Sequence, residues 1–257
     1  MYKLFKRMHR PGRLEVQLAG ACDPGCAREL NEDAIGMHVD ATHGYYLAVV
    51  CDGMGGHSAG EIASALAVDM ISREIETHFS TVAPKGLLNR AFARANTQID
   101  ALAEANPDAE GMGCTAVAVL GVDETVYVAH VGDSRAYRRR NDTFEQITTD
   151  HTMVQEMLDT GLLTPDQAAT HPYRGRISAC LGHGKNKSEP TVSAFSLAPG
   201  DNLLLCSDGL SDVVGADELS ALVGQRDIRD AIGRLIGAAN KAGGPDNVSA
   251  MILRRCV

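Results

Sequence analysis

Short apolar runs with strand character alternate along the chain with turns that are rich in aspartate, glycine and asparagine. Turns of this length and composition, such as GVDET and RRNDTF, favour antiparallel hairpins over parallel crossovers. The apolar runs predict strands at residues 14–20, 34–39, 45–51, 114–121, 125–132, 135–140, 191–198, 202–207 and 247–255.

Between residues 58 and 106 the pattern becomes alanine-rich with a period near 3.6, which predicts two long helices. A break at 82–84 separates them, and Pro84 suits the first turn of the second helix. Two more helices are predicted at 217–224 and 227–242. This order favours an α+β fold in which helices cover antiparallel sheets. No linker or repeat interrupts it, so we predict one domain at 13–257 behind a frayed basic tail at 1–12.

The composition of the chain disfavours some classes of binding partner. The chain has 257 residues and a formal charge of −9, which argues against a nucleic-acid groove or an anionic membrane surface as its main partner. No apolar run reaches the ~18 residues of a membrane-spanning helix. Seven scattered cysteines indicate reduced core residues in a cytosolic protein, and their spacing disfavours a zinc site. We therefore expect none of the cysteines to be a nucleophile.

Acidic residues flank the ends of the predicted strands. Asp33 precedes strand 34–39 and Asp52 follows strand 45–51, so antiparallel pairing returns both to one end of the hairpin. The same argument applies to the hairpin that ends at Asp133 and to the strands next to Asp208 and Asp246. The acids expected at one edge of the fold are Glu32, Asp33, Asp52, Asp133, Asp208 and Asp246.

Each of these aspartates taken alone suits an ordinary turn. Five acids at one edge would repel each other unless cations neutralise them, and carboxylates without thiol or imidazole partners suit Mg²⁺ or Mn²⁺. Gly53 would let a backbone carbonyl approach such an ion, and Gly55 and Gly56 would keep the loop open. The spacing matches neither a dinucleotide nor a nucleotide phosphate loop.

Eight segments together resemble the metal-dependent Ser/Thr protein phosphatases of the phosphatase 2C family, bacterial type. They occur in the family's order and span the chain from about residue 12 to its end. The segments are RELNEDA (28–34), VVCDGMGGHSAGEIAS (49–64), GCTA (113–116), AHVGDSRAYR (129–138), TTDHT (148–152), ISACLG (177–182), LLLCSDGLSD (203–212) and GGPDNVSAMIL (243–253).

The resemblance implies a β-sandwich of two antiparallel sheets flanked by helices, with a two-metal centre at one end. It implies that Asp52 bridges both metals and that the Gly53 carbonyl binds one of them. Further roles follow by the same resemblance: Asp208 and Asp246 bind the other metal, Glu32 and Asp33 hold metal-bound waters, Asp133 helps hold a weaker third metal, and Arg28 receives the substrate phosphate. Asp33 and Asp52 would thus act with Arg28 in catalysis.

The identity of the proton donor stays open. Met54 stands where eukaryotic members carry a histidine, so a metal-bound water or His57 could donate instead, although His57 equally suits a helix cap. His151 is expected to order the loop after Asp150. Residues 152–176 resemble the flap of bacterial members, in which Arg174 and Arg176 could meet either a phosphopeptide or solvent.

These features predict a cytoplasmic, monomeric phosphatase that hydrolyses phosphoserine and phosphothreonine in proteins, by attack of a metal-bridging water. It would use two Mn²⁺ or Mg²⁺ ions and oppose a bacterial Ser/Thr kinase. Two alternatives remain. One is a phosphatase-like scaffold without turnover, which the complete set of acids disfavours. The other is a metallohydrolase for non-protein phosphate esters, which turnover on phosphopeptides and on phosphorylated metabolites would distinguish.

Overall fold

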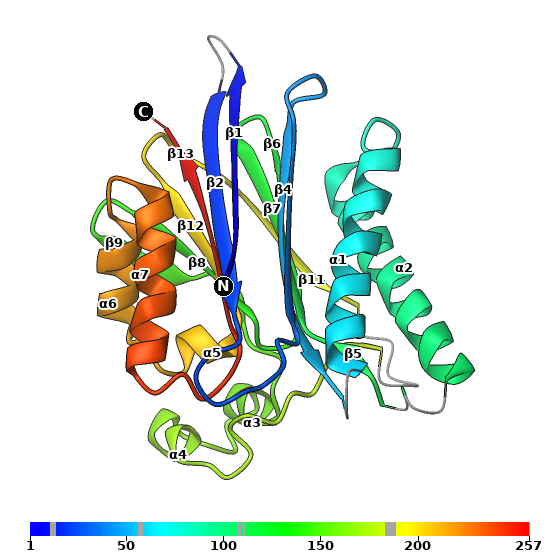
Figure 1. Ribbon diagram of the computed structural model, residues 1–257, viewed down its shortest axis with the longest axis vertical. Helices are drawn as coiled ribbons and strands as arrows, with labels where there is room; N and C mark the ends of the chain where they lie inside the picture. The colour runs from blue at the N-terminus through cyan, green and yellow to red at the C-terminus, as the bar shows by residue number, and fades with distance from the viewer. Residues whose placement is uncertain (11–13, 56–58, 107–108, 110, 183–188, 257) are drawn as a thin grey trace.

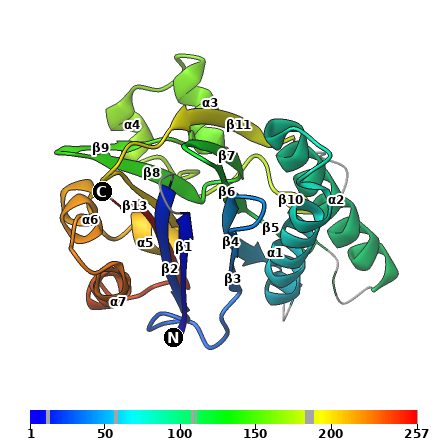
Figure 2. The ribbon, with the colours of Figure 1, turned by 90° about the horizontal axis from the view of Figure 1, so that it is seen from above.

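The computed structural model describes residues 1–10, 14–55, 59–106, 109, 111–182 and 189–256. Two antiparallel sheets stack face to face, with helices on both outer sides (Figures 1 and 2). The predicted α+β sandwich is confirmed. No helix among the described residues is long and apolar enough to cross a membrane.

The six-stranded sheet is built from both ends of the chain and from its second half. Its strands are, in spatial order, β1 (Tyr2–Arg10), β2 (Leu14–Asp23), β13 (Val248–Arg255), β12 (Asn202–Cys206), β8 (Arg135–Arg140) and β9 (Thr143–Gln146). Helices α6 (Ala216–Val223) and α7 (Ile228–Lys241) lie on its outer face (Figure 2).

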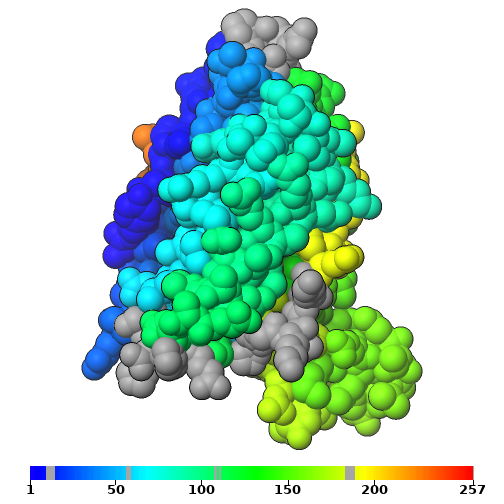
Figure 3. All heavy atoms as spheres, turned by 90° about the vertical axis from the view of Figure 1, so that its right-hand side faces the viewer, coloured from blue at the N-terminus to red at the C-terminus, as the bar shows by residue number. Residues whose placement is uncertain are grey.

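The seven-stranded sheet carries the hairpin that contains Asp33 and Asp52. Its order is β10 (Leu181–Gly182), β5 (Gly113–Cys114), β4 (Tyr45–Met54), β6 (Ala116–Val122), β7 (Thr125–Val131) and β11 (Thr191–Ser196), and β3 (Asp33–Asp40) also pairs with β4. Helices α1 (Ala59–His78) and α2 (Pro84–Ala105) cover its outer face (Figure 3).

Burial explains why β4 is apolar on both faces. Tyr46, Ala48 and Val50 point between the sheets, while Leu47 and Val49 pack under α1 and α2. Alternate residues of one strand thus enter two different cores. Because both faces of β4 are buried, its register is strongly determined, and the acid at its end has a well-defined position.

Three short helices lie at one end of the sandwich. Helix α5 (Asp208–Ser211) follows β12 directly. Helices α3 (Met153–Asp159) and α4 (Pro165–Ala169) form a small lobe below the sheets (Figures 1 and 3). This lobe is the predicted flap, and its helix, glycine turn and proline-started helix occur as expected, with Gly161 at φ 72°.

The expected frayed tail at 1–12 is wrong for residues 2–10. They form β1, which pairs with β2 along its whole length, and Met8 is only 1% exposed in the core between the sheets. The basic side chains hid this strand, because Lys and Arg can stay in solvent while Met8 is buried and Leu4 is partly buried. Pro11 and Gly12 lie outside the described residues.

Candidate metal centre

The β3–β4 hairpin places two carboxylates side by side. Asp33 lies directly opposite Asp52 in the antiparallel register, and the turn lies at the other end of the hairpin, after Asp40. The predicted pairing is confirmed. Glu32 lies next to this pair, because the Gly53 amide donates to the Glu32 carbonyl oxygen (3.1 Å).

The six-stranded sheet brings further acids to the same end. Strands β12 and β13 pair with Cys206 opposite Ala250, so Asp208 after β12 and Asp246 before β13 lie at one end of the pair. Asp208 raises the pKa of Asp33, Asp52 and Asp133 by charge repulsion. The acids predicted to share one edge are therefore close enough to change each other's pKa, and they lie at the same end of the sandwich.

Burial is the largest cause of the raised pKa values, and repulsion between the acids adds to it. Burial and the nearby Asp208 raise the pKa of Asp33 to about 7. The same two causes raise the pKa of Asp133 to about 7. The pKa of Asp52 is well above its ordinary value, because Asp52 is desolvated and lies close to Asp33, Asp208 and Asp133. Strongly shifted acids with specific charged neighbours are typical of functional sites.

Two carboxylate oxygens in this cluster are buried without a hydrogen-bond partner, Glu32 Oε1 and Asp33 Oδ1. The other Asp33 oxygen accepts a hydrogen bond from Ser207 Oγ (2.8 Å). Buried carboxylate oxygens without partners are costly unless a proton or a cation compensates them. The donor set contains only oxygen, which fits hard divalent ions such as Mg²⁺ and Mn²⁺.

The side chains are not drawn together around a common point. Among the described residues, no group of three or more Asp, Glu, His and Cys side chains is arranged to hold one ion. Arg28 donates to Asp246 Oδ2 (2.9 Å), so this expected metal ligand is engaged by the expected phosphate ligand. Binding of an ion at Asp246 would free the Arg28 guanidinium from this carboxylate.

Glycines make the close approach of three backbone segments possible. A Cβ atom at Gly53 would lie 2.1 Å from the Gly60 carbonyl oxygen, and one at Gly60 would lie 2.4 Å from Glu32 Oε1. The tight contact between β4, the start of α1 and Glu32 thus requires glycine at both positions. Gly53 was a predicted metal ligand, whereas no role was predicted for Gly60, whose only signal was its place eight residues after Asp52.

Replacing Gly60 by alanine should lower both stability and phosphatase activity. The added methyl group must displace Glu32 or the Gly53 backbone, at a cost of about 1–3 kcal/mol for overpacking. Gly237 in α7 is a matched control, because no atom lies within 4 Å of its Cβ position. Gly237→Ala should keep activity and raise the melting temperature slightly. A Gly60→Ala protein with wild-type melting temperature and turnover would contradict this packing.

Asn247 connects the segments around the acids and was not assigned a role from the sequence. Its Oδ1 accepts from the Glu32 amide (2.8 Å), and its Nδ2 donates to the carbonyl oxygens of Pro24 (3.0 Å) and Leu30 (2.8 Å). Asn247 is 5% exposed. One side chain thus satisfies three backbone groups and holds Glu32 next to Asp246. The Asp-Asn dipeptide before a strand had indicated only a turn.

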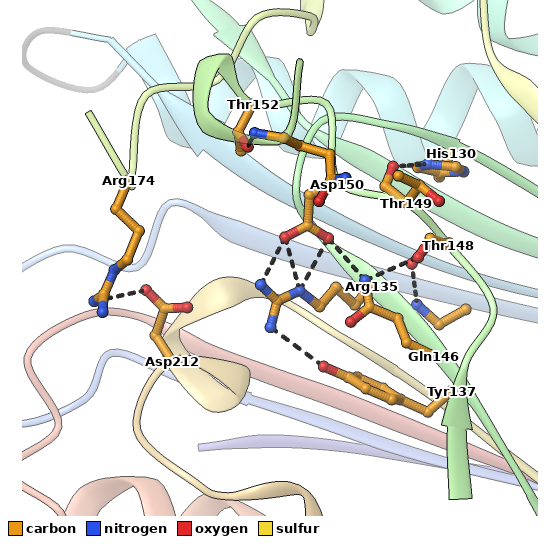
Figure 4. Close-up of polar contacts among 12 residues, drawn as sticks. His130, Arg135, Tyr137, Gln146, Thr148, Thr149, Asp150, Thr152, Arg174 and Asp212 are labelled. Carbon is orange, nitrogen blue, oxygen red and sulfur yellow. Dashed lines mark hydrogen bonds and ion pairs between the residues drawn. The ribbon is translucent and has the colours of Figure 1, made fainter. Parts of the chain in front are cut away.

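A cavity of about 340 Å³ opens between the flap and the acids. Asp133 and Asp208 line one side of it, and Val154, Leu158 and Ala168 of the flap line the other. Arg174 lies 3.8 Å from Asp212 in an ion pair that joins the flap to α5 (Figure 4). Arg176 instead lies against the Tyr173 ring. A molecule in this cavity would lie against Asp133 and Asp208 of the acid cluster.

The loop before the flap is held by a polar network next to this cavity (Figure 4). Arg135 donates three bonds to Asp150, from Nε to Oδ1 and Oδ2 (3.0 Å each) and from Nη2 to Oδ2 (2.6 Å). His151 accepts from the Gly132 amide through Nδ1 (3.3 Å), and burial lowers its pKa. The expectation that His151 orders this loop is therefore confirmed.

The loop after β4 is described only in part. Gly56 and His57, to which the sequence analysis gave roles, lie outside the described residues. Gly55 has φ 147°, a backbone conformation that favours glycine. Met54 is partly buried at the end of β4 and has no proton to donate.

Comparison with known proteins agrees with this geometry. The family model described as protein phosphatase 2C matches residues 27–252. The chain belongs to the protein phosphatase 2C family. The match begins just before Arg28 and ends within β13, so it includes every acid of the cluster.

Bacterial members of the phosphatase 2C family are similar over most of the chain. The serine/threonine protein phosphatase PstP of Mycobacterium tuberculosis is 37% identical over 244 residues, which cover 93% of this chain but 45% of PstP. The chain thus spans about half the length of that relative. A serine/threonine phosphatase of Listeria welshimeri is 35% identical, with 91% of this chain and 93% of that protein covered.

A solved structure of a family member contains metal. The catalytic domain of PstP in complex with two manganese ions matches with a TM-score of 0.81 and 34% identity. The match covers 94% of this chain and 99% of that one. The sandwich is therefore the fold of phosphatase 2C proteins.

Proposed function

We propose that this protein is a metal-dependent phosphatase that hydrolyses phosphoserine and phosphothreonine in proteins. The observation that carries the proposal is the direct register of Asp33 with Asp52, joined by Asp208 and Asp246 from the other sheet. Relatives of the same fold are named serine/threonine phosphatases, which supports this reaction class.

Two Mn²⁺ or Mg²⁺ ions are the proposed cofactors, with a weaker third. Asp52 would contact both ions, the Gly53 carbonyl one of them, and Asp208 and Asp246 the other, while Asp133 would share the third with Asp208. When bound, the ions would neutralise the phosphate charge and activate the attacking water. The oxygen-only donors and the unpaired oxygens of Glu32 and Asp33 support this assignment.

The chain's own side chains then have separate tasks. Glu32 and Asp33 would hold and orient waters, because one buried oxygen of each, Glu32 Oε1 and Asp33 Oδ1, has no hydrogen-bond partner. Arg28, half-exposed beside Asp246, would bind two phosphate oxygens with its planar guanidinium. His151 is not the proposed proton donor, since its ring is engaged by Gly132 and its pKa is lowered.

The activity is tested with a phosphothreonine peptide in the presence of Mn²⁺ and again after chelation. Turnover should require the metal and return when Mn²⁺ is restored. Hydrolysis that continues unchanged in chelator would overturn the metal assignment. The same assay with phosphorylated metabolites decides the alternative substrate class, since faster turnover on those compounds would refute a protein substrate.

Phosphorylated proteins and a Ser/Thr kinase that modifies them are the proposed partners, and we propose a cytoplasmic monomer as the working form. The scaffold alternative predicts no turnover on any phosphate ester. The retained acids and the open cavity beside them favour an enzyme.

A further inference from the structure

The edge strand β1 concentrates positive charge on an acidic protein. Among the strands that the structure describes, β1 ends the six-stranded sheet and pairs only with β2. Its nine residues include four lysines and arginines and no acid, whereas the whole chain has a formal charge of −9. Figure 1 shows β1 in front of β2, with α7 beside them. One edge of the sandwich therefore differs in charge from the molecule as a whole.

Alternate residues of β1 face α7 and solvent. The Arg229 guanidinium of α7 lies 5.2 Å from the centre of the Phe5 ring, and Phe5 remains 45% exposed. Arg7 pairs with Glu15 of the neighbouring strand. Met8 points the other way, into the core. The outward face of β1 thus combines an aromatic ring with basic groups.

An open groove of about 670 Å³ runs between this face and the connection from α6 to α7. Asp227 and Asp230 also line it, but Asp227 is already bonded to Arg229. Gln17, Gln225 and Arg226 line the groove with hydrogen-bond donors, and Arg7 and Arg229 add only the donors that their bonds to Glu15 and Asp227 leave over. The groove is therefore suited to carboxylate groups.

We propose that β1 and this groove bind an extended acidic segment of a partner protein. The segment would add as a strand to the free edge of β1, with its acidic side chains on the face of Lys3 and Arg7 and its apolar ones on the opposite face. A strand of nine residues offers an edge of about 30 Å. A second copy of the chain is disfavoured because two basic edges would repel, and the net charge disfavours nucleic acid.

The probe is a fluorescent peptide of alternating glutamate and valine, long enough to span β1, added to the full chain with Mn²⁺. We expect saturable binding, and Lys3→Glu/Arg226→Glu, which reverses two charges on the groove side of β1, should weaken it at least about tenfold. Arg73→Glu/Lys85→Glu, on α1 and α2, changes the net charge equally and should change affinity less than about twofold. Both variants should keep the wild-type melting temperature and hydrolysis of p-nitrophenyl phosphate.

Hydrogen exchange locates the bound peptide. Protection of the β1 amides by the glutamate peptide, and weaker binding by Arg226→Glu, would support the surface. Three results would each overturn it: absence of binding, equal binding of a lysine–valine peptide, or protection confined to residues outside β1 and the groove. An oligomer that forms without peptide through β1 would also refute it in favour of a second copy.

Discussion

Replacing Asp52 by alanine should reduce Mn²⁺-dependent hydrolysis of a phosphothreonine peptide by at least about 10³-fold, which corresponds to about 4 kcal/mol of transition-state stabilisation. Asp33, Asp208 and Asp133 all raise the pKa of Asp52, in addition to its burial. Removal of this carboxylate would leave both proposed ions without their shared ligand. Steady-state turnover with saturating Mn²⁺ measures the effect.

Asp40→Ala is the matched control for this substitution. Asp40 lies at the other end of the same hairpin, where its Oδ1 accepts from the amides of Thr42 (2.8 Å) and His43 (2.9 Å). Its loss should lower stability slightly and leave turnover within about twofold. Full metal-dependent activity in Asp52→Ala would refute the assigned centre.

Asp33→Asn should stabilise the metal-free protein at high pH, although it should lower the phosphatase activity. Burial raises the pKa of Asp33 to about 7 from an ordinary value of 3.8. Between these values the folded protein keeps a proton that the unfolded chain has lost, so this group's contribution to stability falls as pH rises. At about pH 8 the charged, buried Asp33 costs up to about 4 kcal/mol, which asparagine avoids.

Thermal unfolding in chelator measures this difference. The melting temperature of Asp33→Asn should exceed that of the wild type by several degrees at about pH 8 and match it near pH 5. Saturating Mn²⁺ at high pH should reverse the order, because an ion stabilises the ionised wild-type cluster.

Asp227→Asn serves as the control for the pH effect. Hydrogen bonds from the permanently charged Arg229 lower the pKa of Asp227 to about 2, so neither group titrates in the same pH range. The difference in melting temperature between this variant and the wild type should therefore be the same at both pH values. A wild-type protein that is more stable than Asp33→Asn at high pH without metal would contradict the assignment of a buried, uncompensated carboxylate.

The position of the acids was predictable because it follows from strand register. Apolar runs on both sides of a short turn fix which residues of β3 and β4 oppose each other, so Asp33 and Asp52 had to meet. Asp208 and Asp246 also lie at one end of β12 and β13, but three helices separate these strands in the sequence, so their pairing was a hypothesis that the structure had to confirm. Local periodicity also predicted α1 and α2, including the start of α2 at Pro84.

Features that depend on tertiary contacts were not predictable in this way. The hydrogen bonds of Asn247 join residues more than 200 positions apart in sequence, and no local pattern marks them. The need for glycine at position 60 arises from the approach of Glu32 and of the Gly53 backbone. Strand β1 exists because β2 offers it a free edge, although its sequence is basic.

Anomalous scattering from a crystal grown with Mn²⁺ tests the central claim most directly. The account predicts two strong manganese peaks per chain that both contact Asp52. One should also contact the Gly53 carbonyl, and the other Asp208 and Asp246, with Arg28 released from Asp246. Absence of manganese at the junction of the two sheets, or peaks that do not touch Asp52, would contradict it.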